Sequence, residues 1–188
     1  MDLYNKTSYK ISKIVTKSYS TSFSLGIAAF SPQYRDAIYG IYGFVRIADE
    51  IFDTFNQFDQ KKLMDNFRKE TEEALKTGIS TNPILQAFIH TVKEYKIDYH
   101  YIDAFLKSME MDLTNSYYEP QQYNEYIYGS AEVVGLMCLQ IFAGNDEKLF
   151  NDLVAPARSL GSAFQKVNFL RDIKSDMEER ERIYLPGV

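Results

Sequence analysis

Two pairs of aspartates with identical spacing are the residues of this sequence best suited to chemistry. Asp49 and Asp53 form the first pair, and Asp172 and Asp176 form the second. Because an α-helix turns by roughly 100° per residue, residues four apart lie on one face of it. Carboxylates so placed suit Mg²⁺, which prefers carboxylates, water and substrate phosphate oxygens. A single such pair is commonly an accident of an exposed helix, but its repetition predicts two sites for Mg²⁺, or for Mn²⁺ in its place.

Polar residues precede the two pairs at matching distances. Tyr42 lies seven residues before Asp49, and Gln165 lies seven residues before Asp172. The further polar residues beside the pairs are Arg46, Asn168 and Arg171. Two such faces opposed across a helical bundle would hold Mg²⁺ around a diphosphate, with the arginines as fixed cations. The predicted chemistry is therefore metal-assisted departure of pyrophosphate.

The elements that must position these residues are predicted to be helices. Proline and glycine number only 5 and 9, and the apolar residues between them recur at helical spacing, so we predict an all-α protein. A helix is expected from Ser31-Pro32 to about Thr54, apolar on nearly all sides and therefore buried, with its acid pair lining an internal space. Further helices are expected over 62–76, 83–95, 98–113 with Asp98 as N-cap, 122–142 and 158–181, and a short one over 146–154 ends near Pro156.

Length and composition limit the classes of protein. A chain of 188 residues with 45% hydrophobic and 25% charged residues is expected to fold as a single domain, 1–188. Its net charge of −5 argues against a nucleic-acid partner. The single cysteine, Cys138, excludes an internal disulfide, and the polar first residues lack the pattern of a signal peptide, so a cytoplasmic protein is expected. No run approaches 18 apolar residues, so no membrane span is expected.

Several segments, in their order along the chain, resemble the squalene and phytoene synthases, the head-to-head isoprenoid synthases, and look most like the bacterial phytoene synthases. The segments are 19–23, 39–46, 109–113, 128–135, 165–176 and 182–186. The resemblance implies an isoprenoid-synthase-type helical bundle with a central cavity. Members of the family usually continue for several more helices, so the chain is expected to lack C-terminal helices.

The resemblance also implies a role for particular residues. The catalytic aspartates and metal ligands would be Asp49 and Asp53 in the first site, and Asn168, Asp172 and Asp176 in the second. Diphosphate contacts are implied for Ser20, Thr21, Ser22, Tyr42, Arg46, Gln165 and Arg171. Phe23, Val134 and Gly135 are the expected wall of an apolar channel for the prenyl tails, where small residues such as Gly129 and Gly135 leave room.

The implied reaction joins two identical prenyl diphosphates in two stages. Loss of pyrophosphate from the first gives an allylic cation, which the double bond of the second attacks to form a cyclopropylcarbinyl diphosphate; this ionises in turn and rearranges. We expect two geranylgeranyl diphosphates to give phytoene. The alternative is a squalene or dehydrosqualene synthase acting on farnesyl diphosphate, in which only squalene formation needs NADPH. The apolar substrate and product suggest peripheral contact with the inner face of a membrane.

Two alternatives of another class are a non-catalytic assembly factor of the same fold and a purely structural bundle. An assembly factor is expected to have lost metal ligands, whereas all four aspartates are present. A head-to-tail prenyltransferase or a terpene cyclase fits segment 165–176 poorly. Three residues depart from the family pattern. Glu50 stands where a second aspartate is common and is expected to point away from the metal face, Tyr19 stands where a basic residue or histidine is common, and Ser108 replaces a common glycine.

Overall fold

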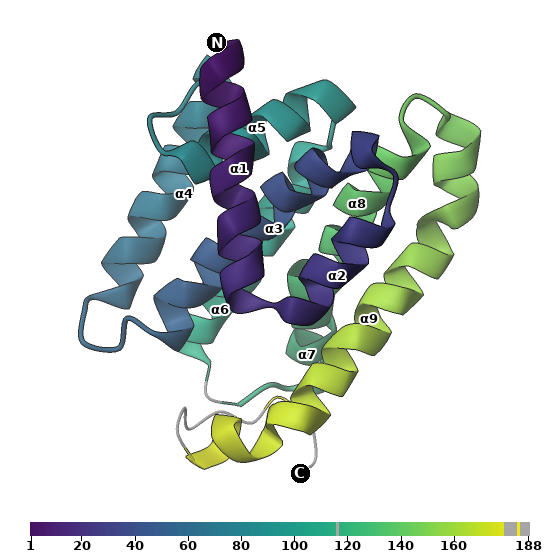
Figure 1. Ribbon diagram of the computed structural model, residues 1–188. Helices are drawn as coiled ribbons and strands as arrows, with labels where there is room; N and C mark the ends of the chain where they lie inside the picture. The colour runs from purple at the N-terminus through teal and green to yellow at the C-terminus, as the bar shows by residue number, and fades with distance from the viewer. Residues whose placement is uncertain (116, 179–183, 185–188) are drawn as a thin grey trace. The chain divides into compact units, whose positions relative to one another are not determined.

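The computed structural model describes residues 1–115, 117–178 and 184, and of Ser175, Asp176 and Glu178 it describes the backbone (Figure 1). The secondary-structure elements of these described residues are all helices, which confirms the all-α prediction. They are α1 (Asp2–Tyr19), α2 (Thr21–Ala29), α3 (Pro32–Asp53), α4 (Gln60–Thr77), α5 (Pro83–Tyr95), α6 (Tyr99–Thr114), α7 (Pro120–Ile127), the π-helix η1 (Tyr128–Glu132), α8 (Val133–Ala143) and α9 (Glu147–Glu178).

The chain divides into two compact units. The first contains Met1–Ile97 and Gln140–Asn145, and the second contains Asp98–Leu139 together with the described residues from Asp146 onward. The first acid pair lies in the first unit, on α3, and the second acid motif lies in the second unit, on α9.

The core of the first unit is formed by α1, α3, α4 and α5. Phe44 of α3 stacks between Phe67 of α4 and Phe88 of α5, with ring centroids 5.3 and 3.8 Å apart. Helix α3 starts as predicted, with Ser31 at its N-cap and Pro32 in its first turn. This packing fixes the face of α3 that carries the first acid pair.

Two helices of the first unit, α1 and α2, precede the predicted elements. The buried positions of α1 are Ser8, Tyr9, Ser12 and Thr16. Small polar residues therefore form most of the face that α1 packs against α3 and α5, and such a face carries little apolar periodicity. This explains why the pattern of the sequence did not indicate a helix there.

The helix expected over 122–142 lies in the helical stretch Pro120–Ala143, in which Tyr128–Glu132 form the π-helix η1 that packs against both α6 and α9. A break predicted in the next helix was wrong. The separate helices expected over 146–154 and 158–181 form the continuous α9, with Pro156 inside it. Pro156 is exposed, so the carbonyl group that loses its helical hydrogen bond can be solvated by water.

Helices α7, η1 and α8 form one uninterrupted stretch, Pro120–Ala143, of 24 residues. Within the described residues it is the helix that is long and apolar enough to cross a membrane, with a mean hydropathy of 1.4 in its most apolar window. The apolar runs of the sequence predicted no such stretch, because polar residues such as Glu132 and Gln140 interrupt them. Half of the window is buried inside the protein, as in the core helix of a globular domain, so hydropathy alone does not assign the stretch to a membrane.

Candidate active site

The first acid pair is organised around Arg46, one turn before it on α3. The Arg46 Nη1 atom lies 4.0 Å from Asp49 Oδ2, and its Nη2 atom lies 3.4 Å from Asp53 Oδ2. Nη2 also donates a hydrogen bond to Glu50 Oε1. Three carboxylates thus converge on one guanidinium group, which leaves these four side chains with a formal charge of −2. Such an excess favours the binding of a divalent cation.

The three carboxylates of this set differ in exposure. The side chains of Asp49 and Asp53 are 35% and 31% exposed, so both can reach a ligand in solution. The Glu50 side chain is 8% exposed and is bound to the arginine from the protein interior. Glu50 therefore anchors Arg46 from the interior, while the two aspartates contact the same guanidinium group and remain accessible to solvent.

The N-terminal end of α2 adds hydroxyl groups to this region. Ser20 is the N-cap of α2, and its Oγ atom accepts a hydrogen bond from the Phe23 backbone N–H at 3.1 Å and lies 3.3 Å from Ser22 Oγ. The rings of Phe23 and Tyr42 are 5.4 Å apart, which places the Tyr42 side chain beside the first turn of α2. Helix N-termini and hydroxyl donors beside an arginine suit an anionic group such as a phosphate.

Tyr19, which stands at a position where the family often has a basic residue, is part of the same set. Its ring lies 4.6 Å from the Arg46 Cζ atom, and the nearby Glu50 carboxylate helps burial to raise the pKa of the Tyr19 hydroxyl group. In the sequence, Tyr19 is recognisable only as a departure from the family pattern. Its place directly before Ser20 was the one signal that could have indicated this contact.

The pKa values of this set follow from burial and from the shared arginine. Burial alone would lower the pKa of the Arg46 guanidinium group, but the hydrogen bond to Glu50 and the nearby carboxylate charges outweigh it and raise that pKa. Burial would likewise raise the pKa of the Glu50 carboxyl group, but hydrogen bonds with Arg46 and Thr54 outweigh it, so that pKa is lowered. Burial raises the pKa of the Tyr42 hydroxyl group, so it stays protonated and can donate a hydrogen bond at neutral pH.

The lowered pKa of Glu50 predicts an acid-sensitive contribution to stability. A carboxyl group whose pKa is below its ordinary value of 4.5 stabilises the fold above that pH, and the stabilisation is lost as the pH falls through the folded-state pKa. We therefore expect Glu50→Gln to flatten the loss of unfolding free energy between about pH 5 and pH 3. Urea unfolding followed by circular dichroism at a series of pH values measures this.

Glu72→Gln is the matched control for that experiment. Glu72 pairs with Arg68 at the same i,i+4 spacing as Glu50 with Arg46, but its side chain is 46% exposed. An exposed pair of this kind contributes little, so the control should keep the wild-type pH profile. Equal profiles for Glu50→Gln and the wild type would contradict the role given to the Arg46–Glu50 pair.

The second acid motif follows the middle of α9. Arg171 and Asp172 form a two-point ion pair, with Nε 2.7 Å from Oδ1 and Nη2 2.6 Å from Oδ2. Asn168 Nδ2 lies 3.5 Å from Gln165 Oε1. The side chains of Arg171 and Asp172 are 66% and 33% exposed. As on α3, an arginine of the same helix is paired with an acid of the motif; the side chain of Asp176 lies outside the described residues.

The predicted channel residues Val134 and Gly135 lie on α8, and Gly129 lies in η1. A Cβ atom at Gly135 would lie 3.2 Å from the Ala157 carbonyl oxygen of α9, and one at Gly129 would lie 2.5 Å from the Ala104 carbonyl oxygen of α6. The space that these glycines leave is therefore taken by neighbouring helix backbones. The expectation that it accommodates a prenyl tail was wrong for Gly129, because α6 fills it.

The donor atoms of the two motifs fit Mg²⁺. Among the described residues, no three or more His, Cys, Asp or Glu side chains are arranged to hold a metal ion by themselves. Mg²⁺ is commonly held by one or two carboxylates, with water and substrate phosphate completing its coordination. Asp49 with Asp53, and Asp172 with Asn168, supply only oxygen donors of this kind, and the negative charge around Arg46 adds to the fit.

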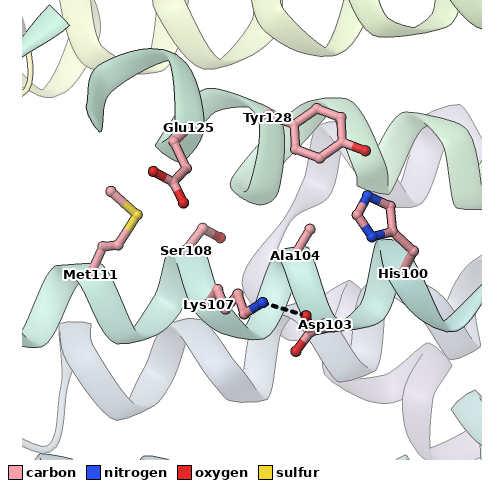
Figure 2. Close-up of a pocket in the computed structure, with 8 residues that line it drawn as sticks. All are labelled: His100, Asp103, Ala104, Lys107, Ser108, Met111, Glu125 and Tyr128. Atoms are coloured by element: carbon pink, nitrogen blue, oxygen red, sulfur yellow. Dashed lines mark ion pairs between the residues drawn. The ribbon is translucent and has the colours of Figure 1, made fainter. Parts of the chain in front are cut away.

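A separate small pocket of about 160 Å³ lies between α6 and the α7–η1 stretch (Figure 2). Figure 2 shows Asp103 and Lys107 paired at its edge, with Glu125 and Tyr128 on the opposite side. The Lys107 Nζ and Asp103 Oδ2 atoms are 2.7 Å apart. It is lined by His100, Asp103, Ala104, Lys107, Ser108, Met111, Glu125 and Tyr128. No residue of the acid motifs lines it, so it is distinct from the predicted sites.

Comparisons with known proteins agree with these motifs. The family model described as squalene/phytoene synthase matches residues 16–187. A chloroplastic phytoene synthase of Daucus carota is 32% identical over 178 residues, which cover 92% of this chain and 44% of that protein. The 15-cis-phytoene synthase of Synechocystis is 31% identical over 188 residues, which cover 95% of this chain and 55% of that protein. The chain spans about half the length of these curated relatives.

Two solved structures have the same fold. A dehydrosqualene synthase superposes with a TM-score of 0.81 at 24% identity, over 96% of this chain and 62% of that one. A squalene synthase from Alicyclobacillus acidocaldarius superposes with a TM-score of 0.81 at 22% identity, over 96% of this chain and 66% of that one. These superpositions confirm the predicted isoprenoid-synthase-type helical fold.

Proposed function

This chain belongs to the squalene/phytoene synthase family, and on that premise we propose that the complete protein condenses two molecules of geranylgeranyl diphosphate head to head into phytoene. Relatives named phytoene synthase support the choice of substrate and product. The observation that carries the proposal is the Arg46-centred set, in which one arginine contacts both aspartates of the first pair beside the N-terminus of α2.

In this proposal the chain holds each diphosphate through charged and hydroxyl groups. Asp49 and Asp53 on α3, and Asn168, Asp172 and Asp176 on α9, would hold Mg²⁺ or Mn²⁺. When bound, the metal neutralises charge on the departing pyrophosphate. The phosphate contacts would come from Ser20, Thr21, Ser22, Tyr42, Arg46, Gln165 and Arg171. Tyr42 donates a hydrogen bond because its hydroxyl group stays protonated at neutral pH.

The two arginines have a second task before substrate binds. Arg46 contacts both aspartates of the first pair, and Arg171 pairs with Asp172, so each arginine offsets negative charge within its own motif. With a divalent cation bound, the arginines would no longer be needed to offset this charge and could turn toward phosphate oxygens. Mg²⁺ and diphosphate are therefore expected to bind together more tightly than either alone.

We assign one prenyl tail to an apolar surface of the first unit that includes Phe23. Phe23 is 56% exposed although it is a large apolar residue, and its ring lies against Tyr42 beside the proposed phosphate contacts. A tail extending from the diphosphate would cover it. An apolar substrate and product also favour a cytoplasmic protein that contacts the inner face of a membrane transiently.

A product assay with the complete protein tests the proposal. With Mg²⁺, radiolabelled geranylgeranyl diphosphate should give phytoene, and NADPH should not change the product. Farnesyl diphosphate is the matched substrate, and mass spectrometry identifies each product. Predominant turnover of farnesyl diphosphate would favour the alternative, a dehydrosqualene synthase or, if NADPH is required, a squalene synthase, which are the names of the two superposed structures. No product from either substrate would contradict both enzymes and favour a non-catalytic assembly factor.

A further inference from the structure

A buried carboxylate of the second unit, outside both acid motifs, accepts hydrogen bonds from three tyrosines. Asp112 on α6 is 8% exposed. Its Oδ1 atom accepts from the hydroxyl groups of Tyr118 and Tyr184, both at 2.9 Å, and its Oδ2 atom accepts from Tyr126 at 2.8 Å. Three donors on one carboxylate fill most of its acceptor capacity. We call Asp112, Tyr118, Tyr126 and Tyr184 the tyrosine cluster.

The three rings of the tyrosine cluster pack against one another, and two of them, Tyr126 and Tyr184, line the space that one residue of α9 fills. The rings of Tyr118, Tyr126 and Tyr184 are each 5.1 Å apart. Phe169 stacks on Tyr184 at 4.6 Å and lies 6.0 Å from Tyr126. Hydrogen bonds to Asp112 fix the angle of each tyrosine ring, so they also fix the shape of the pocket that Phe169 fills.

Phe169 is the anchor of α9 near the second acid motif. It is 4% exposed and, among the residues of α9 whose side chains are described, it is the only buried one. The neighbouring large apolar residues Val167 and Leu170 are 59% and 63% exposed. The rotation of this turn of α9 about its axis therefore depends on how Phe169 is held.

Asn168 directly precedes Phe169, and Asp172 follows it by three residues. On a rigid helix, any rotation of Phe169 turns these two ligands by the same angle. We propose that the tyrosine cluster is a positioning device for the second acid motif, which directs Asn168 and Asp172 by holding Phe169. The proposal rests on the proposed function, in which that motif binds Mg²⁺ with diphosphate.

The test measures metal and pyrophosphate binding by isothermal titration calorimetry. The complete protein carries Asp49→Asn and Asp53→Asn, so that the motif on α9 remains as the site, and Mg²⁺ with pyrophosphate is the titrant. Tyr184→Phe removes one hydroxyl group from Asp112 and keeps the stacked ring. We expect it to weaken binding about tenfold, as loss of outer-shell partners of metal ligands commonly does. Thermal unfolding of each variant gives its midpoint temperature, and the titrations are carried out well below that temperature.

Tyr123→Phe is the matched control. Tyr123 packs its ring 5.8 Å from Phe169, but its hydroxyl group is not among the donors to Asp112. The Tyr123→Phe variant should bind Mg²⁺ and pyrophosphate as tightly as the parent protein does. Tyr118→Phe, which removes the other donor to Oδ1, is the second variant and should weaken binding similarly if Tyr184→Phe does not fold.

A purely structural cluster predicts a different result. In that case the variants would unfold at lower temperature, but the folded protein would bind Mg²⁺ and pyrophosphate as tightly as the parent, and the inference would be overturned. If the protein with both acid motifs intact also gave no binding heat, the proposed function itself would fail, and the inference would fail with it. The two failures are thus distinguished by the unmutated protein.

Discussion

Asp53→Asn is expected to lower the rate of product formation by at least about a hundredfold, because it removes one of two accessible carboxylates of a proposed metal site. The formal charge of the Arg46-centred set falls from −2 to −1, and a set with that charge attracts a divalent cation less strongly. Asp172→Asn should have a comparable effect, since its two oxygens are the ones paired with Arg171 on α9. Initial rates with Mg²⁺ and geranylgeranyl diphosphate measure both.

The same substitution should leave the fold almost unchanged. Without the Asp53 charge, Arg46 keeps its contacts with Asp49 and Glu50, so no buried charge loses its last partner. Removing one of several like charges within two turns also relieves repulsion. We expect the free energy of unfolding to change by no more than about 0.5 kcal/mol, measured by urea unfolding.

Asp65→Asn is the control for this pair of measurements. Asp65 forms an i,i+4 pair with Lys61 at 2.8 Å on α4, and its side chain is 56% exposed. The Asp65→Asn substitution removes one negative charge, as Asp53→Asn does, but at a position outside both motifs. This variant should therefore keep wild-type activity. Retained turnover in Asp53→Asn would refute the metal role of the first pair, whereas a large loss of stability would show that the pair is structural.

The sequence was sufficient to predict the parts of the fold that depend on local signals. Ser31-Pro32 starts α3, and Asp98 caps α6 through a hydrogen bond from the His100 backbone, both as predicted. The membership of the two acid motifs in helices was also predictable, because their spacing is helical. These features each depend on residues within a few positions of one another.

Contacts between distant residues could not be predicted in the same way. The tyrosines that bind Asp112 lie 6, 14 and 72 residues from it, and no periodicity joins them. The spacing of Arg46 and Glu50 allows an ion pair within α3, but the burial of Glu50, whose side chain is 8% exposed, depends on how α3 packs against other helices. The different roles of Asp49, Glu50 and Asp53 therefore depend on the positions of their side chains in the folded protein, which the sequence pattern does not specify.

Gly129→Ala is expected to destabilise the protein strongly, although it adds only one methyl group. A Cβ atom at Gly129 would lie 2.5 Å from the Ala104 carbonyl oxygen and 2.6 Å from Ser108 Cβ, both on α6. One of these contacts is with backbone, so η1 and α6 must separate to admit the methyl group. Overpacking of this kind costs about 3 kcal/mol of unfolding free energy. Urea unfolding of the variant measures it.

Gly26→Ala provides the opposite expectation with the same chemical change. Gly26 lies in α2, and a Cβ atom there would meet nothing within 4 Å. Because alanine favours a helix more than glycine does, the free energy of unfolding of this variant should rise by about 0.5–1 kcal/mol.

Ser108→Gly in the Gly129→Ala protein removes the contact with Ser108 but not the one with the Ala104 carbonyl, so it should restore only part of the loss. Full restoration, or a Gly129→Ala protein as stable as the wild type, would contradict the close approach of η1 to α6 on which the prediction depends.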